Sequence, residues 1–184
     1  MDLSDPRSQL VKSFMDVVSI VRPRCFVIEN VKALGTLKKF REVREQLRSI
    51  SLEMGYSFEY HVLNSKNFGV PQKRERVFVV GFAGVKSTQF LKRVQLHYTP
   101  EVSVKAALCH LGPEGSDNNP RTCNAVITLA ANPVLRRSAY AGMLFNGAGR
   151  PLNPLSPSTT LPASMGGNKT PIIDERHFYG DGSS

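Results

Sequence analysis

The sequence predicts an α/β domain followed by a loop-rich region with small strands, and three observations lead to this fold class. Apolar residues recur at helical spacing in the segments 5–21 and 37–52. Short apolar or alternating runs, typical of strands, lie at 25–28, 57–63 and 76–82. Beyond about residue 95 this regularity gives way to frequent Gly, Pro, Ser and Asn, which mark turns and loops.

The first helix and strand place polar groups at a strand end. Asp5 and Pro6 suit the start of the helix, and Pro23 stops it. The continuous apolar run Cys25–Ile28 then predicts a buried parallel strand, which ends abruptly in Glu29 and Asn30. Ligand chemistry in open α/β sheets lies at such strand ends, so these two residues are the first candidates for a site.

The remaining elements of the first region complete a small sheet. The amphipathic helix 37–52 is followed by Gly55 and by the alternating strand Ser57–Leu63. The apolar strand Arg76–Phe82 comes after the loop Asn64–Glu75, which is too long and polar for a tight hairpin and favours a functional role. This α-β-α-β-β order predicts one antiparallel neighbour at the end of the sheet.

The second region is predicted as a separate domain. We divide the chain into residues 1–95, residues 96–179 and a disordered tail at 180–184. A short helix is expected at Val102–Leu111 and a short strand at Ala125–Leu129, whereas Asn132–Lys169 is dominated by turn residues.

Charge and composition narrow the functional classes. The chain carries a formal net charge of +9, with most of the excess in residues 1–100, and Asp and Glu are absent from Asn118 to Ile173. An acid-free stretch with scattered arginines suits a surface lying against DNA phosphates, although a loop-rich domain that merely lacks acids would look the same. The three cysteines show no metal-ligand spacing, and no membrane span or signal peptide is apparent, so we expect a soluble cytoplasmic protein without a metal.

Two clusters are candidates for chemistry. Glu29 follows four apolar residues, so it forms either a structural ion pair or helix cap, or a pocket carboxyl that binds a ring nitrogen. In the run Gln72–Arg76, strand alternation points Arg74 and Arg76 to one face and Lys73 to the other. Two guanidiniums on one face suit a phosphate or a base carbonyl, whereas a solvated charge run is the plainer interpretation.

Together these motifs resemble the middle of a bacterial-type DNA cytosine-5 methyltransferase. The resemblance is close over residues 4–82, and the Glu-Asn-Val strand end combined with the Gln-x-Arg-x-Arg block is its most specific part. A looser similarity to the target-recognition region of that family runs from Ser138 to Lys169 and includes the Thr160-Leu161 pair. The segments that carry the close resemblance are Asp5–Leu10, Arg22–Val31, Tyr56–Phe58 with Leu63 and Asn64, and Phe68–Val77.

The resemblance implies a role for each matching residue. The sheet would be the second half of a Rossmann-like methyltransferase sheet that uses S-adenosylmethionine, and the target cytosine would be flipped out of double-stranded DNA. By this match Glu29 holds the ring N3 and exocyclic amine, Arg76 contacts O2, and Leu10 borders the methyl donor. Asn30 positions the pocket and Arg74 supports the catalytic loop. The residues expected to contact DNA are Gln72, Lys73, Arg150, Thr160, Leu161 and Lys169.

The resemblance also implies parts that this sequence lacks. The glycine-rich donor-binding turn and the proline-cysteine loop with the nucleophile would precede Asp5, and Cys25 does not match that loop. We therefore expect an inactive isolated chain that is a fragment or one subunit of a split enzyme, with a second polypeptide as a possible partner. A non-catalytic DNA-binding or regulatory module on the same scaffold, and an unrelated α/β protein, stay open as alternatives.

Overall fold

The protein contains two compact units. The computed structural model describes residues 6–85, 89–120, 122, 150–161, 171–173 and 178–179. The first unit comprises Met1–Asn64 and Glu75–Tyr98, and the second comprises Ser65–Arg74 and Thr99–Ser184. The loop that interrupts the strands of the first unit therefore belongs to the second unit. The division into a catalytic domain at residues 1–95 and a target-recognition domain at residues 96–179 stays a prediction.

Helix α1 (Pro6–Val21) confirms the helix predicted at the start of the chain. Its Met15 and Val18 are buried in the core. The helix ends where Arg22 adopts a φ of 49° and donates its backbone N–H to the carbonyl of Val18 at 2.9 Å. Pro23 cannot continue a helical hydrogen-bond pattern, so the chain turns into the first strand.

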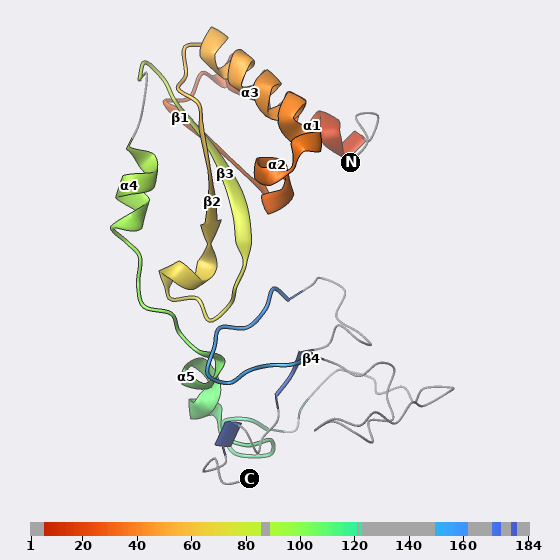
Figure 1. Ribbon diagram of the computed structural model, residues 1–184, viewed down its shortest axis with the longest axis vertical. Coiled ribbons are helices and arrows are strands. Elements are labelled where there is room, and N and C mark those ends of the chain that lie inside the picture. The colour runs from red at the N-terminus through yellow and green to blue at the C-terminus, as the bar shows by residue number, and fades with distance from the viewer. Residues whose placement is uncertain are drawn as a thin grey trace, which may run out of the picture. The chain divides into compact units, whose positions relative to one another are not determined.

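Helix α3 (Arg41–Glu53) occupies most of the second predicted helix and lies beside α1 (Figure 1). A single 3-10 turn, η1 (Lys38–Phe40), precedes it. The short helix α2 (Lys32–Thr36) was not predicted, because five residues are too few to show a helical period. A Cβ on Gly35 would lie 2.8 Å from Cγ2 of Val77, so glycine lets α2 approach the sheet.

The sheet of the first unit has three strands in the order β1-β3-β2 (Figure 1). They are β1 (Cys25–Val31), β2 (Glu59–Asn64) and β3 (Glu75–Phe82). Both outer strands pair antiparallel with β3. An antiparallel neighbour was predicted, but at the end of the sheet, whereas the antiparallel strand β3 lies in its centre. The central position of β3 explains why Val77, Val79 and Val80 are almost fully buried.

Strand β1 differs from its prediction. It was expected to be buried and parallel, yet its strand partner among the described residues is the antiparallel β3. Cys25, Val27 and Glu29 are exposed, while Phe26 between them is buried. The prediction was wrong because an apolar run cannot reveal whether both faces of a strand are covered, and β1 forms an edge of the described sheet.

One hydrophobic core joins the sheet to the two long helices. Met15 and Val18 of α1 pack with Phe26 of β1, Leu47 of α3 and Val79 of β3. Burying each large side chain of this kind stabilises the fold by about 1.5–3 kcal/mol. Tyr56 joins the same cluster, with its ring 5.4 Å from that of Phe26 and its hydroxyl donating to the carbonyl of Pro23 at 2.6 Å.

The second unit is built from short elements. A short helix, α5 (Val104–Leu108), continues into the 3-10 turn η3 (Cys109–Leu111), which confirms the helix predicted at 102–111. The strands β4 (Arg150–Pro151) and β5 (Pro171–Ile172) form a parallel pair. The predicted strand at 125–129, most of the predicted loop region 132–169 and the tail at 180–184 lie outside the described residues.

Candidate nucleotide-binding site

Glu29 and Arg76 meet on one face of the sheet. Arg76 pairs with Val31 in the register of β1 and β3, so it lies diagonally across from Glu29, and strand alternation points both side chains the same way. Nε of Arg76 lies 3.0 Å from Oε1 of Glu29. The Glu29 side chain is 49% exposed and that of Arg76 is 21% exposed. The pair is thus a charge-assisted contact that remains accessible to a ligand.

The Arg76 guanidinium is held on its strand by a second contact. Its Nη1 donates to the carbonyl of Glu75 at 2.8 Å. A guanidinium carries five N–H donors, so two contacts leave other donors for a ligand. The arrangement therefore combines a fixed cation with a carboxylate that can accept or, when protonated, donate a hydrogen bond.

Asn30 and Arg74 lie elsewhere. The Asn30 side chain accepts the backbone N–H of Val31 at 2.8 Å, and alternation turns it to the opposite face of β1 from Glu29. Arg74 is exposed and belongs to the second unit, one residue before β3 begins. The roles assigned to Asn30 and Arg74 stay predictions.

A second ion pair between the ends of the same two strands was not predicted. Nζ of Lys32 lies 2.9 and 3.0 Å from the carboxylate oxygens of Glu75. Both side chains are about half exposed. Their opposite charges were the available sequence signal, but residues 43 apart show no periodic pattern that would pair them. This pair ties the start of α2 to the first residue of β3.

Within the second unit, Ser65 closes the loop Ser65–Arg74, which carries the first three residues of the Gln-x-Arg-x-Arg block. Its backbone N–H donates to the carbonyl of Arg74 at 3.0 Å. Its hydroxyl donates to the carbonyl of Gln72 at 2.6 Å and accepts the backbone N–H of Arg74 at 3.2 Å. The loop begins with the 3-10 turn η2 (Ser65–Phe68), and Gly69 then adopts a φ of 74° that favours glycine. One serine thus fixes both ends of the loop.

The same loop is joined to a distant segment of the second unit. The backbone N–H of Lys73 donates to the carbonyl of Ser158 at 2.7 Å, and the N–H of Ser158 donates to the carbonyl of Pro71 at 2.9 Å. The Thr160 hydroxyl donates to the carbonyl of Lys73 at 2.7 Å. The structure therefore brings Gln72 and Lys73 together with Thr160, as three of the residues predicted to contact DNA.

Of the other predicted DNA contacts, Leu161 has a described side chain. Leu161 is 40% exposed and lines an apolar cavity of about 440 Å³ in the second unit, together with Val70 and Val104. Arg150 belongs to β4, but its side chain lies outside the described residues, as does Lys169. Their contacts with DNA stay predictions.

Leu10 is the residue that the resemblance places at the border of the methyl-donor site. Leu10 on α1, the predicted donor-bordering residue, is 65% exposed and offers apolar surface alone. Binding sites for such molecules also need a few well-placed polar groups, which Leu10 does not bring. The residues therefore fit the border of a donor site and not a whole one.

Metal and membrane chemistry receive no support from the described residues. They contain no group of three or more His, Cys, Asp or Glu side chains that could hold a metal ion. No helix in the described ranges has both the length and the apolar character needed to cross a membrane.

Comparison with known proteins gives the family. Residues 1–126 match the family model for C-5 cytosine-specific DNA methylases. The Type II methyltransferase M.AquIA of Picosynechococcus sp. is 42% identical over 97 residues, which are 49% of this chain and 39% of that protein. The Type II methyltransferase M.HpaII of Haemophilus parainfluenzae is 42% identical over 84 residues, which are 42% of this chain and 24% of that protein.

A solved structure gives a weaker likeness. The S. pombe Dnmt2 methyltransferase aligns with 57% of this chain and 34% of its own length, at 20% identity and a TM-score of 0.44. The chain thus spans less than two fifths of the length of these relatives. The assignment rests on the sequence match: with the family model covering more than half of its 184 residues, the chain belongs to the C-5 cytosine-specific DNA methylase family.

Proposed function

We propose that this chain is the part of a DNA cytosine-5 methyltransferase that holds the target cytosine. The whole enzyme would transfer a methyl group from S-adenosylmethionine to carbon 5 of that base. The observation that carries the proposal is the contact of 3.0 Å between the Glu29 carboxylate and the Arg76 guanidinium on an accessible face of the sheet. Membership of the family supplies the reaction class, and the pair supplies groups suited to it.

The pair matches the pairing edge of cytosine. That edge presents an amine donor followed by two acceptors, the ring N3 and the carbonyl O2. A protonated Glu29 donates to N3 and accepts from the amine, while Arg76 donates to O2. Because these atoms are hydrogen-bonded to guanine within a duplex, the base must first be rotated out of the stack.

The same contacts favour the chemistry. Carbon 5 of cytosine is a poor nucleophile, and the family reaction begins when a cysteine thiolate adds to carbon 6. Electron density then moves through the ring toward N3 and O2, where the Glu29 proton and the Arg76 charge stabilise it. S-adenosylmethionine supplies the methyl group when bound. Loss of the proton from carbon 5 then expels the thiolate from carbon 6 and restores the double bond of the ring. Cys25, Cys109 and Cys123 follow Arg24, Leu108 and Thr122, so none of them belongs to a proline-cysteine motif. We therefore assign the thiolate to a segment outside these 184 residues.

DNA contact is proposed for the second unit. The loop containing Gln72 and Lys73 is hydrogen-bonded to the segment that ends in Thr160 and Leu161. Lys73 is exposed, and its charge suits a phosphate, while the joined backbones give the surface a fixed shape. Because its substrate would be double-stranded DNA and the Type II methyltransferase M.AquIA that it resembles comes from Picosynechococcus sp., we propose that the protein acts in the bacterial cytosol.

The first unit carries surface that suits a further α/β segment. The outer edge of β1 has no strand partner among the described residues. Ile20 on α1 and Val27 and Val31 on β1 are each more than half exposed. A strand added to this edge with its own helices would cover apolar groups on both sides of the sheet. We propose that the donor-binding and nucleophile segments dock here, from the same polypeptide or from a second one.

Methyl transfer from labelled donor to duplex DNA tests the proposal. The chain is assayed alone and then with a polypeptide that carries the glycine-rich turn and the proline-cysteine loop. We expect turnover in the mixture only, and a loss of about 100-fold or more for Glu29→Gln, because the acid that protonates N3 is removed. Glu42→Gln, which removes an exposed carboxylate from α3, is the matched control and should keep full rate.

The outcome separates the alternatives. If Glu29→Gln leaves the reconstituted rate unchanged, the pocket assignment is wrong. The non-catalytic binding module is favoured by a different pair of results. In that case no partner restores turnover, and the unmodified chain and the Glu29→Gln variant bind DNA with the same affinity.

A further inference from the structure

A groove on the first unit lies outside the proposed cytosine pocket. It has a volume of about 480 Å³ and runs between α3 and the outer edge of β2. Three arginines and one carboxylate line it on the helix side, and two aromatic rings, one carboxylate and one imidazole line it on the strand side: Arg41, Arg44, Glu45, Arg48, Phe58, Tyr60, Glu59 and His61. Its size falls within the range of about 300–1,000 Å³ typical of small-molecule sites. We call it the α3–β2 groove.

Arg44 is fixed in this groove before any ligand arrives. Its Nη1 donates to the carbonyls of Leu34 at 2.7 Å and Leu37 at 3.1 Å. Its guanidinium carbon lies 5.8 Å from the centre of the Tyr60 ring, within cation–π range. The side chain therefore loses little conformational entropy when it binds a ligand, which is the advantage of preorganisation.

Arg48 supplies a cation without an acidic partner. It is exposed, one helical turn beyond Arg44, and the described residues give it no ion-pair or hydrogen-bond partner. Like charges at this spacing on a helix repel each other, and an anion placed between them would relieve the repulsion. Arg41 differs, because its Nε is 2.7 Å from the Glu45 carboxylate, and the hydrogen bond and charge of Glu45 raise the Arg41 pKa.

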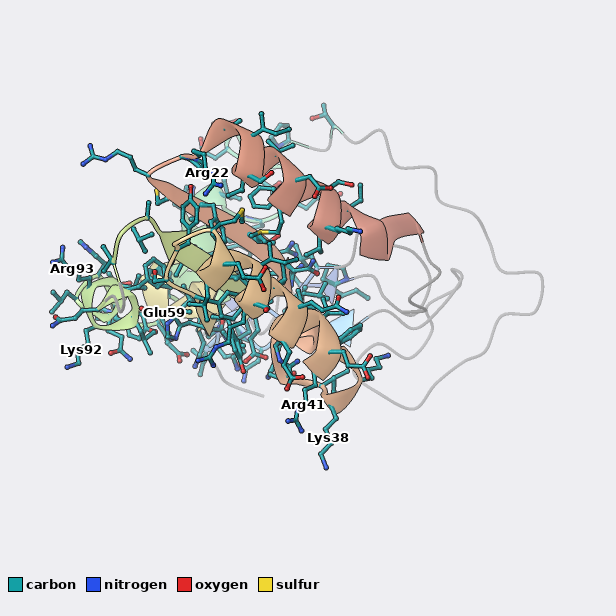
Figure 2. The ribbon with its side chains drawn as sticks, turned by 90° about the horizontal axis from the view of Figure 1, so that it is seen from above. Arg22, Lys38, Arg41, Glu59, Lys92 and Arg93 are labelled. Carbon is teal, nitrogen blue, oxygen red and sulfur yellow. The ribbon has the colours of Figure 1, made fainter. Side chains whose placement is uncertain are left out.

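Figure 2 shows the side chains of Lys38 and Arg41 extending outward from the beginning of α3. Their charges lie near one end of the helix whose later turns carry Arg44 and Arg48. With Lys38, the three arginines outnumber the two carboxylates that line the groove, Glu45 and Glu59, so an excess of positive charge would draw anions toward it.

The strand wall brings aromatic rings and one carboxylate. The Phe58 and Tyr60 rings are 6.2 Å apart, and Tyr60 is 41% exposed. Exposed rings of this kind stack with nucleic-acid bases. Glu59, which lies 3.2 Å from Nε2 of His61, would repel a bare anion but can accept hydrogen bonds from the amine or hydroxyl groups of a nucleoside.

We propose that the α3–β2 groove binds a phosphorylated nucleoside. Arg48 and Arg44 hold the phosphate, and the base lies against Tyr60 and Phe58. Two sources share this chemistry, a free nucleotide and a nucleotide unit of a DNA strand. The site is independent of the cytosine pocket, because Glu29 is on β1 and the groove follows β2, on the other side of β3.

Binding to the full chain tests the proposal. Adenosine monophosphate is titrated by calorimetry, with inorganic phosphate as the anion control and a fluorescently labelled single-stranded dodecamer as the DNA probe. We expect Arg48→Ala and Tyr60→Leu each to weaken nucleotide binding by about tenfold. The first removes a charged contact to the phosphate, and the second removes a stacking contact with the base. Arg93→Ala removes an exposed arginine from α4 (Phe90–Gln95), outside the groove, and should change affinity by less than about twofold.

Each outcome decides the matter. A DNA strand is the ligand if the dodecamer binds at least about tenfold tighter than the nucleotide, with the same loss in both groove variants. A free nucleotide is the ligand if the difference is smaller than that. The proposal is overturned if inorganic phosphate binds as well as the nucleotide, if neither probe binds, or if Arg93→Ala weakens binding as much as Arg48→Ala. Thermal unfolding of each variant confirms that it is folded. Arg48→Lys is a further variant at this position that preserves the charge, and it should retain part of the affinity.

Discussion

Thr160 and Lys73 are joined by a hydrogen bond of 2.7 Å although they are 87 residues apart in the chain. The donor is the Thr160 hydroxyl and the acceptor is the Lys73 carbonyl. The resemblance implies that Thr160 contacts the DNA backbone, and the structure adds that its hydroxyl holds the loop that carries Lys73 and Arg74. A threonine at this position can therefore affect DNA binding through the loop as well as by direct contact.

Thr160→Val keeps the shape of the side chain and removes the donor. We expect the free energy of unfolding to fall by about 0.5–1.5 kcal/mol, and the backbone amide of Lys73 to exchange its hydrogen faster, because the loop is less firmly held. Hydrogen exchange followed by mass spectrometry measures the second effect. Thr159→Val alters an exposed neighbour and should change neither quantity; equal exchange at Lys73 in both variants would contradict the role given to Thr160.

Gly81 is predicted to be intolerant of any side chain. A Cβ there would lie 2.2 Å from Cε1 of Phe26 and 2.8 Å from the carbonyl oxygen of Ser57. Gly81→Ala should therefore lower the free energy of unfolding by about 1–3 kcal/mol or more, since the core must shift to admit the methyl group. Gly84→Ala meets open space but has a φ of 70°, so urea unfolding should show a smaller loss of about 1 kcal/mol. The reverse order would contradict the close packing at Gly81.

Local patterns were sufficient to predict much of the first unit. The helical spacing of apolar residues located α1 and α3, and alternation or apolar runs located β2 and β3. Alternation also predicted the face of the strand to which Arg76 points, and the motif match predicted that Glu29 and Arg76 bind the same base. These features are written in neighbouring residues, so a single sequence reveals them.

Contacts between distant segments could not be predicted in this way. The exposure of Val27 depends on which elements cover β1, and the bond from Thr160 to Lys73 depends on how two loops meet. The pair of Lys32 and Glu75 likewise arises from the register of β1 and β3. None of these has a periodic signature, and α2 is too short to produce one.

Glu29 is expected to matter far more for catalysis than for stability. Its ion pair with Arg76 is half exposed on the glutamate side, and such pairs contribute about 0–1 kcal/mol. The free energy of unfolding of Glu29→Gln, measured in urea, should therefore lie within about 1 kcal/mol of that of the native chain. The reconstituted enzyme with this substitution should lose most of its rate. A large loss of stability would instead indicate that the pair is structural and would remove the main support for a pocket.

The pair formed by Lys32 and Glu75 offers a measurement of coupling between β3 and the start of α2. A double-mutant cycle with Lys32→Ala and Glu75→Ala should give a coupling energy of about 0.2–1 kcal/mol, because both side chains are about half exposed. The coupling should shrink at 1 M salt, where exposed charges are screened. Arg41 and Glu45 on α3 are a matched pair at i,i+4 spacing, and because both side chains are largely exposed their coupling should be weaker and should also shrink at 1 M salt.

The open side of the first unit should make the isolated chain self-associate. Ile20 is 81% exposed on α1, Val27 is 51% exposed on β1, and the outer edge of β1 has no strand partner among the described residues. Exposed apolar surface beside a free strand edge favours edge-to-edge pairing between copies, and a charge placed there opposes it. Ile20→Lys and Val27→Lys should therefore each lower the weight-average mass measured by sedimentation at high protein concentration.

Leu96→Lys is the control for that effect. Leu96 is 83% exposed after the end of α4, so the substitution adds the same charge at a place away from β1. If the β1 side is the surface that a complementing α/β segment covers, Ile20→Lys and Val27→Lys should also weaken binding to that segment, while Leu96→Lys should not. Should Leu96→Lys suppress self-association as strongly as the other two, net charge alone would explain the behaviour, and the β1 edge would lose its assigned role.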